Sequence, residues 1–212
     1  MLGVDTLPRY GVFLRPDPLT CAAVTAIATQ LRAQYGLVSA ATFPPHATLA
    51  GSLPIADPNR LIDNLTRALH DRPEFLVENG GLQWLGDSGG LIYDVSNVGE
   101  QINGELRALA EAVHTVIQPL LTDAPGLAAD TYEPERWRAH LSLASHDLIA
   151  RPDLRDEVWE YAHGLDVTPP ARFHGDTIAL YRFTSPSWTG EWWRAMEWEH
   201  LRSWHLAVRN QR

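Results

Sequence analysis

Two short segments carry matched residue types that are capable of acid–base chemistry. His46-Ala47-Thr48 and His140-Leu141-Ser142 each place a hydroxyl residue two positions after a histidine. Residues i and i+2 of a strand point to the same face, so each segment would present an imidazole beside a hydroxyl. Two imidazoles can divide acid and base work near neutral pH, and hydroxyls can donate to phosphate oxygens. A lone His-x-Thr motif is usually structural, but two copies in matched settings favour a functional pair.

The surroundings of the two motifs run in step along the chain. Pro58 and Pro152 each lie 12 residues after a motif histidine and precede a predicted helix. An apolar strand and then a two-stranded unit follow in both halves. This pattern predicts a diverged internal duplication, with pseudo-repeats at about 40–97 and 134–201 within a single bilobal domain spanning 1–212.

The spacing of apolar residues predicts the elements that position the motifs. Helical periodicity and alternating or continuous apolar runs occur in alternating blocks along the chain. Helices are predicted at 19–35, 61–69, 102–120 and 154–162, and strands at 10–14, 43–53, 75–85, 91–95, 138–144, 173–183 and 192–201. The predicted class is α+β, with two antiparallel sheets that face a central cleft and helices on the flanks.

Composition excludes several kinds of chemistry. All 17 basic residues of this 212-residue chain are arginine, so lysine Schiff bases and lysyl-nucleotide intermediates are excluded. The single cysteine, Cys21, allows neither an internal disulfide nor a cysteine-based zinc cluster, and we expect it to be an inert core residue. The net charge of −9 argues against duplex DNA as a partner. Neither a signal peptide nor an apolar span is evident, so we expect a cytoplasmic protein with no membrane association.

The two motif segments resemble those of a known family. The segments PPHATLAGSL (44–53) and RWRAHLSLA (136–144) resemble the paired H-x-[ST]-x motifs of the 2H phosphoesterase superfamily. That superfamily includes RNA 2′,3′-cyclic phosphodiesterases, formerly called 2′-5′ RNA ligases. It also includes plant and yeast cyclic nucleotide phosphodiesterases, whose closing strands are similar to residues 178–201. Two departures are the alanine at 139, where many members have proline, and the serine at 142 in place of threonine.

The resemblance implies a metal-independent enzyme that needs no cofactor. Its partner would be a nucleotide or an RNA end carrying a 2′,3′-cyclic phosphate, or ADP-ribose 1″,2″-cyclic phosphate. His46 and His140 would supply acid and base, while Thr48 and Ser142 would bind phosphate. The residues do not decide which histidine is the base; we favour His140 as base and His46 as acid. The oligomeric state cannot be read from the sequence, and a monomer is favoured.

Four further residues are candidates for substrate contact. Arg136 and Arg138 lie close to the second motif, and Arg182 lies in a predicted partner strand. Each of the three is a candidate for phosphate contact, with a solvated surface position as the alternative. Tyr181 is a candidate for contact with a base or phosphate, with a core role as the alternative. Five of the eight tryptophans lie in 188–204; we favour a hairpin packed on a helix over a base-stacking surface there.

A protease-like motif and the remaining histidines do not indicate further catalytic or metal sites. Residues 86–90 (GDSGG) copy the sequence around the serine of trypsin-like proteases, but only 87 residues precede Ser88 and no disulfide is available. We interpret the glycines as a hairpin turn between strands. The remaining histidines show no metal-ligand spacing, and His146 is expected in a loop. The main alternative function is a non-catalytic module that binds an RNA end or nucleotide on the same fold.

Overall fold

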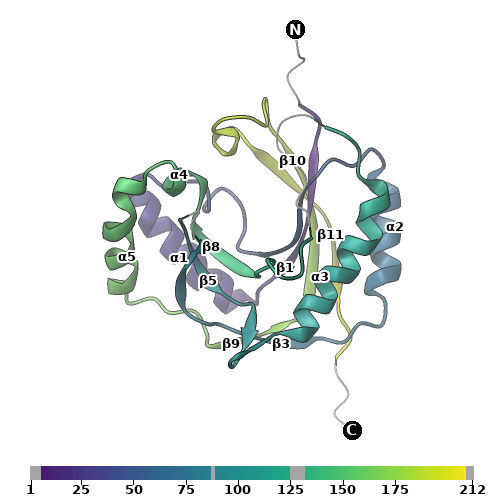
Figure 1. Ribbon diagram of the computed structural model, residues 1–212, viewed down its shortest axis with the longest axis horizontal. Helices are drawn as coiled ribbons and strands as arrows, with labels where there is room; N and C mark the ends of the chain where they lie inside the picture. The colour runs from purple at the N-terminus through teal and green to yellow at the C-terminus, as the bar shows by residue number, and fades with distance from the viewer. Residues whose placement is uncertain (1–5, 87–88, 125–131, 209–212) are drawn as a thin grey trace.

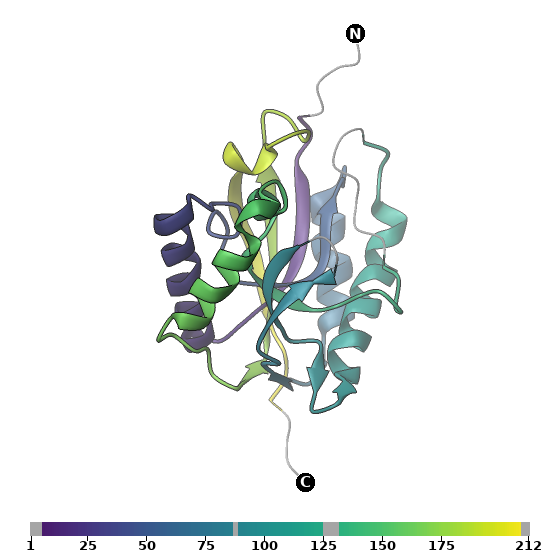
Figure 2. The same ribbon diagram turned by 60° about the vertical axis from the view of Figure 1, so that its left-hand side comes forward.

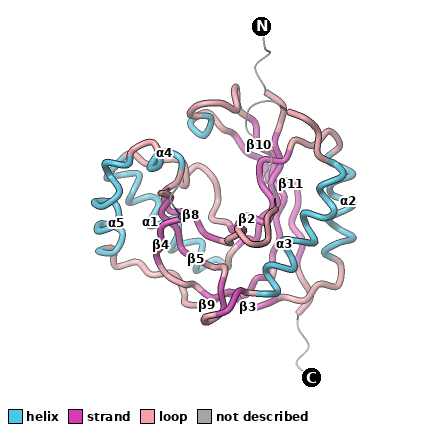
Figure 3. The backbone as a smooth tube through the Cα atoms, viewed as in Figure 1, coloured by secondary structure: helices cyan, strands magenta, loops and turns pink. Residues whose placement is uncertain are grey.

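The computed structural model describes residues 6–86, 89–124 and 132–208 (Figure 1). The chain contains both helices and antiparallel strands, which confirms the predicted α+β class (Figure 3). The elements are β1 (Arg9–Arg15), α1 (Pro18–Tyr35), β2 (Ala47–Leu53), α2 (Pro58–Leu69), β3 (Phe75–Glu78), β4 (Leu82–Leu85), β5 (Gly90–Asp94), β6 (Asn97–Val98), β7 (Gln101–Ile102), α3 (Gly104–Ile117), β8 (His140–Ala144), α4 (His146–Ile149), α5 (Arg155–Gly164), β9 (Arg172–Gly175), β10 (Thr177–Thr184) and β11 (Glu197–His205).

Seven strands form one antiparallel sheet in the order β11-β10-β1-β2-β8-β5-β4. Its two parts meet where β2 lies beside β8, and the described residues of these strands pair at one position, Ala47 opposite Leu141. The two antiparallel sheets expected from the sequence are thus joined into one at the two motif strands. A two-stranded ribbon, β3 with β9, links the halves a second time.

The helices cover the two parts of the sheet from opposite flanks. Figure 2 shows α1 beside α5 on one flank and α2 beside α3 on the other, and both pairs are in contact. Helix α1, which follows β1, packs against β8, and α3, which follows β5, packs against β2. Each motif strand is therefore supported by a helix that begins in the other part of the sheet.

Local sequence signals begin and end these helices. The carboxylate of Asp17 accepts the backbone N–H of Thr20 at 2.7 Å, and Pro18 occupies the first turn of α1. That helix ends at Gly36, whose φ of 72° is a left-handed conformation that glycine adopts without strain. The Asp57 carboxylate caps α2 in the same way, by accepting the N–H groups of Asn59 and Arg60, both at 3.1 Å.

Two apolar clusters lie on opposite faces of the sheet. The larger one contains the inward faces of the helices together with Leu49 and Leu143 of the motif strands, which are at most 1% exposed. The smaller one is aromatic and lies on the other face of β1 and β10; it consists of Phe13, Phe43, Ala179, Tyr181, Phe183 and Trp188. We call this smaller group the aromatic cluster.

Several predicted elements differ in detail from the structure. The strand predicted at 75–85 is two strands, β3 and β4, and that at 173–183 is also two, because β3 and β9 leave the main sheet to pair with each other. The strand predicted at 192–201 begins only at Glu197, and Trp192–Arg194 form a 3₁₀ turn. His146, expected in a loop, begins the short helix α4, because the Ser145 hydroxyl accepts its N–H at 2.6 Å.

The Asp57 cap allows a test of helix stability away from the motifs. Substituting Asp57→Ala removes the acceptor of two N–H groups at the start of α2 and is expected to lower the free energy of unfolding by about 1 kcal/mol. Urea denaturation measures this change. An unchanged midpoint would contradict the assignment of Asp57 as a cap.

Candidate active site

The four motif side chains share one face of the sheet. Ala47 and Leu141, which pair across β2 and β8, are 0% and 1% exposed and belong to the larger core. Their neighbours in the strands point the opposite way because side chains alternate across a strand. The two histidines and two hydroxyl residues that flank this pair, His46, Thr48, His140 and Ser142, are all partly exposed. The pairing therefore brings both imidazole–hydroxyl pairs together on the face opposite the core.

Matching β-bulges follow the two motifs. Between β1 and β2 the register shifts so that Leu49 is the extra residue, and between β5 and β8 the extra residue is Leu143. A bulge lets two successive residues of one strand face the same side. Leu49 with Ala50, and Leu143 with Ala144, are accordingly all buried in the larger core. The bulges anchor each motif strand directly after its hydroxyl residue.

Both histidines are held in the same tautomer. The Nδ1 atom of His46 lies 2.8 Å from the carbonyl oxygen of Pro44, and that of His140 lies 2.9 Å from the carbonyl oxygen of Arg138. A carbonyl oxygen only accepts, so each Nδ1 carries the proton and donates it. In the neutral ring Nε2 is then the nitrogen that can accept a proton. The two rings are thus oriented by the same contact, to the carbonyl two residues earlier.

The surroundings of His46 favour its neutral form. Its ring lies edge-on to Phe13 and Phe43, with centroids 4.5 and 4.6 Å away. Desolvation is the largest of three effects that together lower the pKa of His46 to about 4; the bond to Pro44 opposes the shift and the charge of His140 adds to it. At neutral pH His46 is therefore an uncharged proton acceptor.

A buried carboxylate lies opposite the other histidine. Asp94 of β5 pairs with His140 of β8 and is 4% exposed. Its Oδ1 accepts the N–H of Ser96 at 3.0 Å and the Ser96 hydroxyl at 2.5 Å. The sequence did not identify Asp94, Phe13 or Phe43 as neighbours of the motif histidines. Asp94 and Phe13 come close to them only through strand pairing, which no local pattern shows. Phe43 lies only three residues before His46, so its closeness in the chain could have indicated that the two rings are neighbours.

Tyr181 lies on the same side of the sheet as the motifs, one ring away from His46. It is 6% exposed, and its centroid is 4.9 Å from Phe43 and 5.7 Å from Trp198. Burial raises the pKa of the Tyr181 hydroxyl, so this side chain stays neutral. These contacts make it a member of the aromatic cluster that supports the His46 environment.

The arginines occupy three different settings. Arg182 pairs with Tyr10, a residue of the larger core, so it points away from the motif face, and its guanidinium lies 2.5 Å from Glu199. The structure does not bring it to the four motif side chains. Arg136 lies in an exposed turn, 3.2 Å from Glu133. Arg138 is exposed, and its backbone carbonyl orients His140.

The remaining signals fit the hairpin interpretation. β4 and β5 pair as an antiparallel hairpin around the glycine-rich turn. Asp87 and Ser88 lie outside the described residues.

Within 6–86, 89–124 and 132–208, no group of three His, Cys, Asp or Glu side chains is arranged to hold a metal ion. In the same ranges, no helix has both the length and the apolar character needed to cross a membrane.

Comparisons with known proteins identify the family and similar folds. A sequence model of the 2′-5′ RNA ligase superfamily matches residues 16–186. No curated protein sequence matches the chain. Among solved structures, Escherichia coli LigT complexed with NADP+ has a TM-score of 0.54 at 15% identity, covering 98% of this chain and 100% of that chain. LigT complexed with 3′-AMP gives 0.51 at 13%, with coverage of 96% and 99%. The protein TT0787 of Thermus thermophilus gives 0.55 at 17%, with coverage of 95% and 100%.

The packing around His46 predicts the pH at which its imidazole protonates. The imidazole is expected to protonate near pH 4, well below the ordinary value of 6.5, because its charged form is desolvated between Phe13 and Phe43. NMR titration of the ring resonances measures this directly. Since the folded-state pKa is depressed, the stability that neutral His46 contributes is present above pH 6.5 and is lost as the pH falls toward 4. A midpoint at 6.5 would contradict the described packing.

Proposed function

Since this chain belongs to the 2′-5′ RNA ligase superfamily, the 2H phosphoesterases, we propose that it hydrolyses cyclic phosphates of nucleotides or RNA ends. The substrates proposed are 2′,3′-cyclic phosphates or ADP-ribose 1″,2″-cyclic phosphate, and the product is a phosphomonoester. The observation that carries this proposal is the meeting of two imidazole–hydroxyl pairs around the Ala47–Leu141 pair, with both Nδ1 atoms bound to carbonyls. That arrangement supplies an acceptor, a donor and two phosphate-binding hydroxyls on one surface.

The difference between the two histidines supports an assignment of roles. His46 is neutral at neutral pH, so its Nε2 takes a proton from water as the water oxygen attacks phosphorus. His140, in its protonated form, gives a proton to the ribose oxygen as the bond from that oxygen to phosphorus breaks. One P–O bond forms and one breaks, and solvent resets the two rings. This assignment reverses the one favoured from the sequence, which could not include the two phenylalanines around His46.

Thr48 and Ser142 are proposed to bind the phosphate. Each lies two residues after its histidine on the same face of its strand, and a hydroxyl can donate to a non-bridging phosphate oxygen. Such donors stabilise negative charge that grows on these oxygens during attack. Arg138, exposed beside the second motif, remains the arginine proposed to approach the substrate.

The nucleotide part of the substrate is inferred by analogy. Two structures of a protein with this fold are complexes with 3′-AMP and with NADP+. Both ligands are nucleotides that carry phosphate on a ribose, which supports the same class of ligand for this chain. The alternative, a module that binds such ligands without turnover, is separated from the enzyme by the following measurement.

The catalytic roles are tested by alanine substitution. Purified protein is incubated with nucleoside 2′,3′-cyclic phosphates and the products are separated by chromatography. His46→Ala and His140→Ala are each expected to lower kcat by about 10²- to 10⁴-fold, the usual contribution of a general acid or base. His163→Ala is the matched control, since that exposed histidine on α5 also has Nδ1 at a backbone carbonyl, 3.1 Å away, but lies outside the motifs. Binding without hydrolysis by the wild type would favour the non-catalytic module, and activity that survives both substitutions would rule out this site.

Dependence on metal and pH gives a further prediction. Activity is expected to persist in EDTA, because both proton transfers are assigned to histidines. The acid limb of kcat/KM is expected well below pH 6.5, as the base His46 stays unprotonated down to about pH 4. Loss of activity in EDTA that added Mg²⁺ or Mn²⁺ restores, or an acid limb near 6.5, would contradict the proposed roles.

A further inference from the structure

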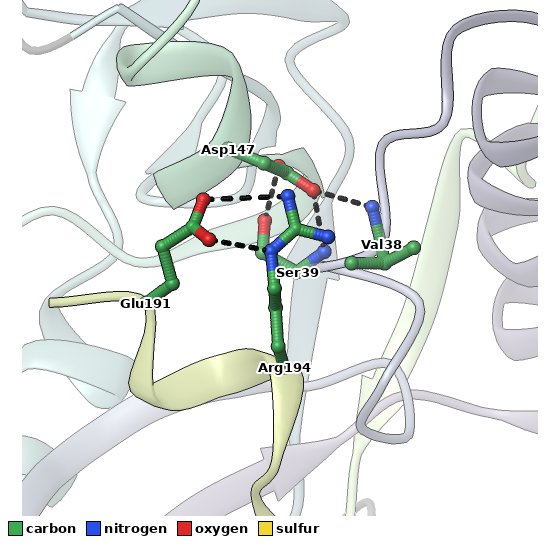
Figure 4. A network of polar contacts seen from close by, with 5 residues as sticks. All are labelled: Val38, Ser39, Asp147, Glu191 and Arg194. Atoms are coloured by element: carbon green, nitrogen blue, oxygen red, sulfur yellow. Dashed lines mark hydrogen bonds and ion pairs between the residues drawn. The ribbon is translucent and has the colours of Figure 1, made fainter. Parts of the chain in front are cut away.

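Three segments that are far apart in the sequence meet at Asp147 (Figure 4). This residue of α4 is 5% exposed. Its Oδ2 accepts the backbone N–H groups of Val38 and of Ser39, the latter at 2.8 Å, and its Oδ1 accepts the Ser39 hydroxyl at 2.5 Å. Arg194, from the segment between β10 and β11, lies beside this carboxylate (Figure 4). The buried carboxylate thus accepts hydrogen bonds from a remote segment and lies near the charge of Arg194.

The Val38–Ser39 turn begins the segment that leads to His46. Residues 38–45 leave α1, which packs against β8, and enter β2. The carbonyl of Val38 accepts the N–H of Ala41 at 3.0 Å and the hydroxyl of Thr42 at 2.9 Å, so the start of this segment is a closed turn. Near its end the segment contains Pro44, whose carbonyl orients His46.

The middle of the segment is also fixed. The indole N–H of Trp198 donates to the carbonyl of Thr42 at 2.9 Å, and Phe43 packs edge-on to His46. The segment is thus held at its start by Asp147 and in its middle by Trp198, and it leads to the ring and the carbonyl that surround this imidazole. Asp147 is the acidic side chain that holds the start of the segment, through both of its oxygens.

Arg194 adds charge and connects a third segment. Its guanidinium lies 2.8 and 3.3 Å from the two oxygens of Glu191, and these contacts, with the nearby charge of Asp147, raise the pKa of Arg194. The same segment also packs on α4 through Trp193, whose ring stacks on His146 with centroids 5.0 Å apart. The carboxylate therefore lies among backbone N–H groups, a hydroxyl and a nearby guanidinium.

We propose that Asp147 is a positioning residue for His46, which acts by holding the turn at Val38 and Ser39 so that the Pro44 carbonyl fixes the imidazole. This inference rests on the proposed function only for its kinetic part. The described hydrogen bonds of Asp147 come from Val38, Ser39 and Leu148. Its effect passes through segment 38–45 to the Nδ1–H of His46 and thus to the nitrogen that accepts the proton from water.

The test compares Asp147→Asn with Asp57→Asn. The first substitution keeps the size of the side chain but turns an NH₂ group toward donors, so the turn is expected to shift. The second removes the charge of the exposed cap of α2, outside the site, but keeps an oxygen that can accept the same two backbone N–H groups. The two ring nitrogens of each histidine are distinguished by ¹⁵N NMR of the imidazoles, and kcat and KM are measured with a nucleoside 2′,3′-cyclic phosphate.

Asp147→Asn is expected to lower the population of the Nδ1–H tautomer of His46, while His140 keeps its Nδ1–H tautomer. It is expected to lower kcat by about 10- to 100-fold, since small misplacements of a catalytic group cost up to about 10²-fold, with KM changed less than threefold. Asp57→Asn should change the melting temperature little, since asparagine caps a helix about as well as aspartate, and should leave the His46 resonances and kcat unchanged. If Asp147→Asn lowers only the melting temperature and leaves the His46 resonances and kcat unchanged, Asp147 is structural and the proposal fails.

Ser39→Ala keeps the test decisive if Asp147→Asn does not fold. It removes one donor to Asp147 and leaves the two backbone N–H bonds, so the protein should fold. A partial change of the His46 resonances with a two- to fivefold fall in kcat is expected, and unchanged resonances would overturn the proposal. The NMR measurement needs no substrate. A wild type that lacks hydrolytic activity would therefore refute the proposed function, while the response of His46 would still decide the role of Asp147.

Discussion

The pairing of β2 with β8 is the constraint on which the rest of the structure depends. One residue pair, Ala47 with Leu141, joins the two parts of the sheet, and each strand is buttressed by a helix that starts in the opposite part. Because the paired residues face the core, their neighbours must face the other side. The two histidines converge as a consequence of register, so a slip of either strand by one residue would turn the two motif side chains of that strand toward the core.

Similar motifs acquire different chemistry from their surroundings. Both imidazoles are oriented by a carbonyl two residues earlier, yet one lies between two phenylalanine rings and the other lies opposite the buried carboxylate of Asp94. Desolvation keeps His46 neutral where an exposed histidine would begin to protonate. An imidazole that stays neutral at neutral pH is suited to accept a proton. The aromatic cluster, with Tyr181 in it, thus has a role in the electrostatics of the proposed site as well as in packing.

The sequence predicts the motifs and the types of most elements, because apolar periodicity and the spacing of His and Thr or Ser are local signals. It does not predict contacts that arise from strand pairing. The position of Phe13 beside His46 depends on the register of β1 with β2, and the assignment of His46 as acid was made without that ring. Arg182 is adjacent to Tyr181 in the chain but lies on the other face of β10. The break between β9 and β10 follows from the pairing of β9 with β3, which no local pattern encodes.

The most direct test of the central claim is a crystal structure of the protein with a bound nucleoside 2′- or 3′-monophosphate, the class of product proposed. The account predicts that the phosphate lies on the face opposite the Ala47–Leu141 pair. Its oxygens should be within hydrogen-bond distance of the Thr48 and Ser142 hydroxyls and of Nε2 of both His46 and His140. A phosphate bound elsewhere, with the four side chains making no contact to it, would contradict the account.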